Sequence, residues 1–177
     1  DSYVVSGSGP DWVSGVPYTF EGYDTYSDSG SVGSDEIVAQ GVGVVDIGLT
    51  GFSIGSGIER IVNATTKVDG TLGVSQVRLL GNWQANTLDF SSVSLLGGNF
   101  VMDGGDGNDT IRGSSLEDRI RGGRDGDVLD GKEGSDSYVV SGSGPDWVSG
   151  VPYTFEGYDT YSDSGSVGSD EIVAQGV

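Results

Sequence analysis

Aspartate residues recur every nine positions between residues 104 and 139, and their side chains could bind metal ions. Four consecutive nonapeptides read GGDGNDTIR, GSSLEDRIR, GGRDGDVLD and GKEGSDSYV. The sixth position of each holds an aspartate, namely Asp109, Asp118, Asp127 and Asp136. Ca²⁺ prefers a flexible shell of about six to eight oxygen ligands, which carboxylates and backbone carbonyls supply. The pattern therefore predicts several calcium ions, with these aspartates among their ligands.

Glycines precede these aspartates in the same nonapeptides. Glycine tolerates positive φ and close approach, so a glycine-rich loop can turn its carbonyls toward an ion. We include five such positions in the predicted sites: Gly104, Gly105, Gly107, Gly122 and Gly123. Ser114 and Leu116 replace the expected glycines of the second loop, and Lys132 puts a cation beside a predicted cation site. These departures should weaken the second and fourth loops.

An apolar residue stands two positions after each aspartate, as expected where a short strand follows each loop. These residues are Ile111, Ile120, Leu129 and Tyr138. Such a strand sends the apolar side chain inward and its neighbours outward. The block therefore predicts short strands with one buried side chain each.

The first nonapeptide, GGDGNDTIR, fits the pattern G-G-x-G-x-D-x-U-x at every fixed position, U being a large apolar residue. The block resembles the RTX (repeats-in-toxin) family of calcium-binding repeats, and the wider unit resembles the long repeats of large bacterial RTX surface proteins and adhesins. The resemblance implies an all-β fold, a right-handed parallel β-solenoid whose turn is two nonapeptides, with calcium in the loops between turns. It also implies type I secretion and an extracellular or cell-surface location.

A turn of two nonapeptides would divide the aspartates between two edges of the solenoid. One edge would carry Asp109, Asp127 and Asp146, and the other would carry Asp118 and Asp136. Because the second and fourth loops depart from the glycine pattern, we expect the edge with Asp109 and Asp127 to bind calcium better.

The same turn length predicts which side chains stack from layer to layer. Val148 would follow Leu129 in the core. On the outer face, Arg112 and Asp130 would be neighbours on adjacent strands and could pair.

A longer repeat frames these nonapeptides. Residues 1–42 recur without change as residues 136–177, so the repeating unit is residues 1–135 and the chain indicates a tandem array. Asp1 and Asp11 are therefore copies of Asp136 and Asp146, and we predict them as ligands too. The expected organisation is the end of one unit (1–42), a less regular β-solenoid segment (43–103), the calcium block (104–149) and degenerate turns (150–177). Other copies of the repeat are the expected partners, in tandem or assembled into fibres or sheets.

Composition excludes several classes of function. The chain carries a net charge of −19 with 8 basic residues, so we expect no nucleic-acid partner, because phosphate contacts need Lys and Arg. It contains neither His nor Cys, so the G-x-S-x-G spelled by residues 51–55 has no histidine to activate its serine, and we expect no enzyme. No apolar run of about 18 residues exists, so we expect no membrane insertion.

Repulsion between stacked carboxylates should make the fold depend on calcium. Divalent ions reverse this repulsion and couple binding to folding, so we expect residues 104–149 to loosen or unfold without calcium.

The expected role is structural, as a segment of a long bacterial surface protein or fibre. Two alternatives remain open: a calcium-binding module of an extracellular enzyme such as a lipase, protease or epimerase, and a carbohydrate-binding adhesin module. The second would use the repeated aromatics, for which packing is the favoured interpretation: Trp12, Tyr18, Phe20, Tyr23 and Tyr26, with their copies Trp147, Tyr153, Phe155, Tyr158 and Tyr161.

Overall fold

The computed structural model describes residues 1–6, 9–10, 17–29, 33–65, 76–141, 144–145, 152–153 and 157–175. This part of the chain is all-β, as expected, and its one helical segment is the short 3₁₀ helix η1 (Ile54–Ser56). Within the same residues, no helix is long and apolar enough to cross a membrane.

The strands form one sheet of eight strands, two sheets of four strands and a two-stranded hairpin. The eight-stranded sheet has the order β18 (Glu171–Gln175), β14 (Ser137–Ser141), β12 (Arg119–Arg124), β10 (Phe100–Asp106), β7 (Val77–Leu80), β5 (Val44–Leu49), β3 (Pro17–Asp24) and β2 (Gly9–Pro10). The first four-stranded sheet has the order β1 (Ser2–Ser6), β4 (Glu36–Gln40), β6 (Arg60–Asn63) and β9 (Ser94–Leu96). The second has the order β17 (Thr160–Ser162), β13 (Val128–Asp130), β11 (Thr110–Arg112) and β8 (Thr87–Asp89). The hairpin joins β15 (Gly144–Pro145) and β16 (Pro152–Tyr153).

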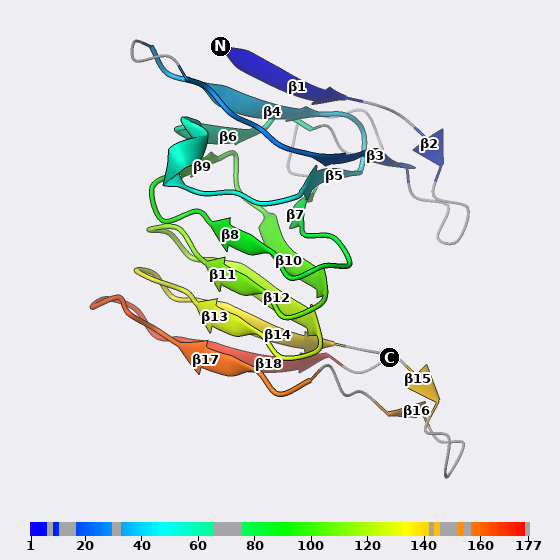
Figure 1. Ribbon diagram of the computed structural model, residues 1–177, viewed down its shortest axis with the longest axis vertical. Coiled ribbons are helices and arrows are strands. Elements are labelled where there is room, and N and C mark those ends of the chain that lie inside the picture. Colours follow the sequence, from blue (N-terminus) through cyan, green and yellow to red (C-terminus); the bar gives the residue numbers. More distant parts are fainter. Residues whose placement is uncertain are drawn as a thin grey trace.

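Apart from the antiparallel pairs β2–β3 and β15–β16, the strands pair in parallel and stack along the long axis, with β1 near one end and β18 near the other (Figure 1). From β10 to β14 the chain alternates between the eight-stranded sheet and the sheet of β11 and β13. Within this block, β10, β11 and β12 each pair with the strand that lies two nonapeptides further along the chain. Ile111 pairs with Leu129, and Ile120 with Tyr138, as the nine-residue period predicts. The strict period therefore sets the register in this block.

The spacing is longer on both sides of this block, because additional residues lie between paired strands. Leu88 pairs with Ile111, and Leu129 pairs with Tyr161, so both pairs are separated by more than two nonapeptides. The prediction that Val148 would follow Leu129 is wrong, because Tyr161 takes that place, and Val148 lies outside the described residues. Both positions follow an aspartate by two residues, so the local pattern did not distinguish them.

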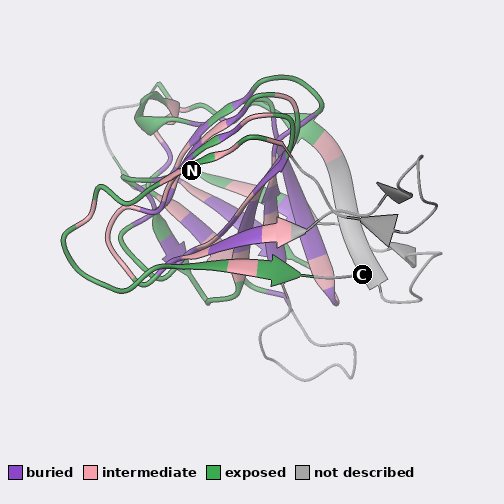
Figure 2. Ribbon diagram, turned by 90° about the horizontal axis from the view of Figure 1, so that it is seen from below, coloured by how far each residue is buried: buried purple, intermediate pink, exposed green. Residues whose placement is uncertain are grey.

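The core lies between the sheets, where buried residues face inward and the loops are exposed (Figure 2). The inward side chain of each short strand is fully or almost fully buried, with 0% exposure at Ile111 and Ile120 and 1% at Leu129. Phe52 and Phe90 stack nearby with ring centroids 5.1 Å apart. Within the nonapeptide block each short strand contributes one such side chain, whereas β5 and β7 contribute two or more, and together they form one continuous core.

The outer face carries ion pairs between neighbouring strands. Arg112 and Asp130 are cross-strand neighbours, as predicted, but the guanidinium of Arg112 pairs with Asp89 on the opposite side, at 3.3 Å. Asp130 instead pairs with Lys132, at 3.1 Å. Two acidic neighbours compete for Arg112, and the repeat did not reveal Asp89, because its distance from Arg112 along the chain is not a multiple of the nonapeptide.

The two identical copies share the pairing of their first and last strands but differ in the strands between them and in burial. β1 pairs with β4 in the same register as β14 with β18, and the Tyr3–Tyr26 edge contact recurs as Tyr138–Tyr161. In the first copy β6 covers the far edge of β4, and Ile37 is 0% exposed. In the second copy β18 ends its sheet, and the equivalent Ile172 is 60% exposed. The pairing of these two strands belongs to the repeat, whereas their burial depends on the next strand.

Candidate metal centre

The backbone N–H of each predicted aspartate donates to a carboxylate oxygen of an aspartate in the next layer. Along one edge, the backbone N–H of Asp109 donates to Oδ1 of Asp127 at 2.8 Å, and the N–H of Asp127 donates to Oδ1 of Asp159 at 3.0 Å. Along the other edge, Asp118 donates to Asp136 at 2.9 Å, and Asp136 donates to Asp170 at 3.0 Å. The structure therefore arranges the four aspartates in two columns, one on each edge.

The remaining predicted ligands do not all join these columns. Asp146 and Asp11 lie outside the described residues, and Asp159 is the residue that follows Asp127. Asp1 is exposed, and its amino group contacts the carboxylate of Asp35, so this pair repeats the contact of Asp136 with Asp170. Asp159 and Asp170, which the nine-residue spacing did not include, thus extend the two columns.

The second carboxylate oxygen distinguishes the loops. Oδ2 of Asp109 and Oδ2 of Asp136 are buried without a hydrogen-bond partner, in residues that are 1% and 0% exposed. Asp118 differs, because both its oxygens accept from Ser114: Oδ2 from the backbone N–H at 2.6 Å, and both from the hydroxyl at 3.0 and 3.1 Å. An unpartnered buried carboxylate oxygen is costly and calls for a cation or a donor.

Backbone conformation explains this difference. In loops 104–109, 122–127 and 131–136, which we term the open loops, the second and fourth residues have positive φ: Gly105, Gly107, Gly123, Asp125, Lys132 and Gly134. No residue of loop 113–118 has positive φ, since Ser114 and Leu116 replace the expected glycines. The backbone N–H of Ser114 therefore points to Asp118 of the same loop.

Loop 81–86 has the same arrangement as loop 113–118, and we term these two the closed loops. The N–H of Asn82 donates to Oδ1 of Asn86 at 2.7 Å, and the N–H of Gln84 donates to Oδ1 of Asn82 at 2.7 Å. Asn86 stands in the aspartate column, and its side-chain amide donates to the carbonyl of Thr50 at 3.1 Å. Both polar atoms of the neutral Asn86 amide therefore have hydrogen-bond partners within the protein, without an ion.

The first glycine of each nonapeptide provides the room beside the carboxylate. A Cβ on Gly104 would overlap the Asp109 carboxylate and the carbonyl oxygen of Gly122. A Cβ on Gly131 would overlap the Asp136 carboxylate and come within 2.8 Å of the Tyr138 hydroxyl. Oxygen atoms from different layers thus converge where a side chain would otherwise stand, which is the donor set that Ca²⁺ prefers.

Burial also raises the pKa values of these carboxylic acids. Loss of solvent raises the pKa of Asp109 to about 7, aided by the charge of Asp127 and opposed by the N–H of Asn86. Burial raises the pKa of Asp118 to about 7 and that of Asp136 to about 6. The protein environment alone therefore makes the charged form less favourable than it is for an exposed aspartate, and a bound cation would counter this effect.

The described residues contain no cluster of three or more acidic side chains that could hold a metal ion. An ion in an open loop would therefore take few carboxylate oxygens and complete its shell with backbone carbonyls and water. Such hard oxygen ligands suit Ca²⁺ or Mg²⁺ rather than Zn²⁺.

Sequence reasoning missed the contribution of Tyr138 to this region. Its hydroxyl accepts from the N–H of Gly131 at 2.8 Å and donates to the carbonyl of Ser162 at 2.6 Å. The only signal was the choice of tyrosine, rather than an aliphatic residue, in the apolar column.

Comparison with known proteins supports a calcium site. A family model described as the RTX calcium-binding nonapeptide repeat, in four copies, matches residues 103–138, which confirms the resemblance inferred from the nonapeptides. No curated protein and no solved structure matches the chain. Residues 103–138 are therefore RTX repeats, and repeats of this family bind calcium.

Proposed function

We propose that this chain is a structural calcium-binding segment of a large secreted or cell-surface bacterial protein, such as an adhesin, surface layer or extracellular fibre. The strands form a right-handed parallel β-solenoid, with several calcium ions in the open loops between successive turns. Calcium drives folding and makes the segment rigid, and the segment has no catalytic role. RTX repeats are typical of secreted bacterial proteins, which supports the extracellular location.

One observation carries the proposal. The carboxylate oxygen Oδ2 of Asp109 is buried without a hydrogen-bond partner, beside the carbonyl oxygen of Gly122 from the next layer. A calcium ion at this position would compensate the buried charge and join two layers of the stack. Binding would therefore stabilise the contact between turns, as a structural role requires.

Other copies of the repeat are the proposed partners. The exposed face of β18 in the second copy has the sequence that β6 covers in the first. In a tandem array, the next unit would cover each such face, and the array would grow as one stack. Solenoids of this kind derive their stability from contacts between neighbouring turns.

Calcium titration tests the proposal. The full chain is stripped of metal and titrated with CaCl₂, and calorimetry counts the ions while circular dichroism measures strand content. Strand content and the midpoint of thermal unfolding should rise together with calcium, and MgCl₂ should have less effect. An unchanged strand signal after calcium removal would contradict the proposal.

A matched pair of variants locates the sites. Asp109→Asn and Asp136→Asn together should reduce the number of bound ions, because each removes an oxygen that lacks a partner. Glu117→Gln removes one charge from the exposed part of a closed loop and should leave the number unchanged. An equal loss per removed charge in both variants would show that calcium binds only to the overall negative charge.

A further inference from the structure

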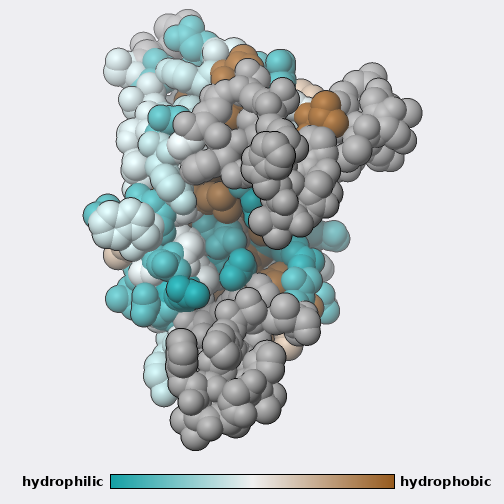
Figure 3. Space-filling model, turned by 90° about the vertical axis from the view of Figure 1, so that its right-hand side faces the viewer, coloured by the Kyte–Doolittle hydropathy of each residue, from teal (hydrophilic) through white to brown (hydrophobic). Residues whose placement is uncertain are grey.

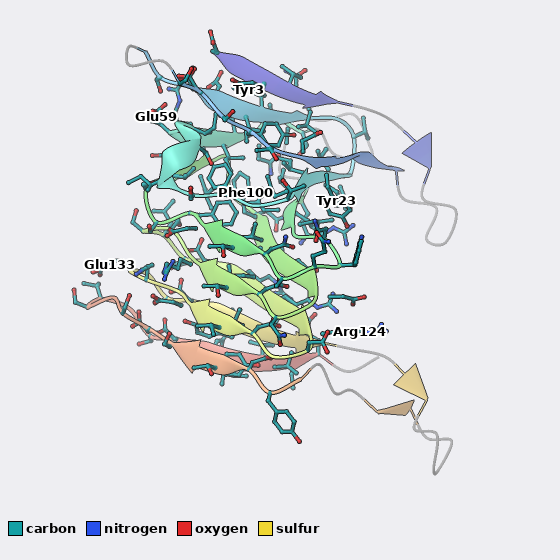
Figure 4. All side chains as sticks on the ribbon, in the orientation of Figure 1. Tyr3, Tyr23, Glu59, Phe100, Arg124 and Glu133 are labelled. Atoms are coloured by element: carbon teal, nitrogen blue, oxygen red, sulfur yellow. The ribbon has the colours of Figure 1, made fainter. Side chains whose placement is uncertain are left out.

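A groove of about 470 Å³ lies on the outer face of the eight-stranded sheet, bordering loop 81–86. Tyr23 and Arg124 line it, and both lie on the right-hand side of the molecule in Figure 4. Figure 3 faces this side and shows hydrophilic residues beside hydrophobic ones among its coloured atoms. The groove has the size of a small-ligand site rather than that of a protein interface.

Three of the chain's eight basic residues line this groove, and each is paired with an aspartate. Arg78 binds Asp46 through two nitrogens, with a distance of 2.7 Å from Nε to Oδ1. In the same groove, Arg121 pairs with Asp103 at 3.3 Å. A third pair joins Arg124 to Asp106 at 3.8 Å (nitrogen to oxygen). Hydrogen bonds orient the guanidinium groups of Arg78 and Arg121. The three pairs together leave the groove close to neutral, in a chain with a net charge of −19.

Two exposed aromatic side chains complete the groove. Trp83 is 73% exposed and Tyr23 is 43% exposed. Trp83 stands in a closed loop, whose backbone is held by the hydrogen bonds from Asn82 to Asn86 and from Gln84 to Asn82. An aromatic ring on a rigid turn loses little conformational entropy when a ligand covers it.

From these contacts we propose that the groove binds a neutral oligosaccharide. A ligand that fits must offer an apolar face to Trp83 and many hydroxyl groups to the fixed arginine and aspartate side chains. A pyranose ring has both. Charged ligands of either sign are disfavoured, because each arginine already has its own carboxylate and each of these carboxylates has its own arginine. The proposal does not rest on the structural role, because the buried carboxylates of the open loops do not line the groove.

A screen of neutral sugars tests the proposal. The calcium-loaded full chain is titrated with cellohexaose, laminarihexaose, mannohexaose, xylohexaose and chitohexaose, with tri-galacturonate as the acidic probe, and calorimetry measures each Kd. At least one neutral probe should bind, and Trp83→Ala should weaken it about tenfold or more. Arg124→Ala should weaken it as well, since Arg124 is the most exposed of the three arginines.

Tyr158→Ala is the matched control. Tyr158 is 89% exposed and does not line the groove, so its loss should leave the Kd unchanged. Circular dichroism and calcium counting verify that each variant keeps its fold. The proposal is overturned if no neutral probe binds, if only the acidic probe binds, or if Trp83→Ala and Tyr158→Ala have the same effect. A chain that binds calcium yet no sugar overturns this proposal alone.

Discussion

Open and closed loops occupy equivalent places in the stack, yet the aspartate or asparagine at their sixth position is hydrogen-bonded differently. In the open loops, positive φ at the second and fourth residues directs the backbone N–H groups away from the carboxylate, and Oδ2 of Asp109 and Asp136 is left without a partner. In the closed loops, Ser114 and Asn82 return a backbone N–H to the side chain of the sixth residue. The backbone conformation at the second and fourth positions therefore decides whether the carboxylate of a loop has a hydrogen-bond donor or is left to a cation.

The largest expected effect comes from pH in the absence of calcium, because several carboxylic acids act together. Their folded pKa values lie near 6 to 7, above the unfolded value of about 3.9, so folding favours the protonated forms. Without calcium, the free energy of unfolding should be highest below about pH 4 and fall as pH rises through 7.

With saturating calcium, protons compete with the ion, so the chain should lose calcium and stability as pH falls through the same range. Urea unfolding at pH 5 and pH 8, in metal-free and calcium buffers, measures both slopes. A metal-free chain that gains stability from pH 5 to pH 8 would contradict the assigned burial.

Adding a methyl group to an open loop should have the next largest effect. Gly104→Ala places a Cβ against the Asp109 carboxylate and the Gly122 carbonyl, at the proposed ion position. We expect a loss of about 1–3 kcal/mol in the free energy of unfolding with calcium present, and one fewer ion. Gly51→Ala is the control, since its Cβ would lie 3.7 Å from the nearest atom, the Thr87 carbonyl oxygen. If Gly104→Ala and Gly51→Ala had equal effects on calcium binding, the ion would not lie beside Gly104.

Removing one charge should affect the two kinds of loop differently. Asp109→Asn should reduce calcium affinity about tenfold or more, which is about 1.4 kcal/mol. In metal-free buffer it should stabilise the chain, because an amide replaces a buried carboxylate, as Asn86 does in the neighbouring layer. Asp118→Asn should change calcium affinity little, since Ser114 already binds both oxygens. Calorimetry and thermal unfolding measure the two effects, and equal losses of affinity would contradict the division of the loops.

Converting a closed loop into an open one should give the smallest effect. Ser114→Gly with Leu116→Gly restores the glycines of the repeat and should add one calcium ion per chain. Without calcium the variant should lose about 1–2 kcal/mol in the free energy of unfolding, because two glycines gain freedom in the unfolded chain. Native mass spectrometry counts the ions. An unchanged count would show that φ at these two positions does not control binding.

The nine-residue period predicted the regular part of the fold because every position there has a fixed structural role. It identified Ile111 and Leu129 as partners and set Asp109 beside Asp127. It failed beyond residue 141, where D-x-U occurs at both Asp146 and Asp159 and only tertiary packing decides which one closes the turn.

The candidate sites were predictable in composition but not in hydrogen bonding. The sequence marked Ser114 as a departure from the glycine pattern, yet not its bonds to both oxygens of Asp118. Those bonds depend on backbone direction, which a residue type restricts without determining. The glycine pattern also did not predict the backbone conformation of Asp125 and Lys132, which both adopt positive φ where glycine was expected.

The identical copies show how much of a strand's burial comes from its neighbour. The same strand has Ile37 buried where β6 pairs with it, and Ile172 exposed where it is the edge of its sheet. A strand of this repeat therefore contributes its full apolar burial only when another strand pairs with it. Stability in such a stack belongs to the contacts between turns rather than to the single turn.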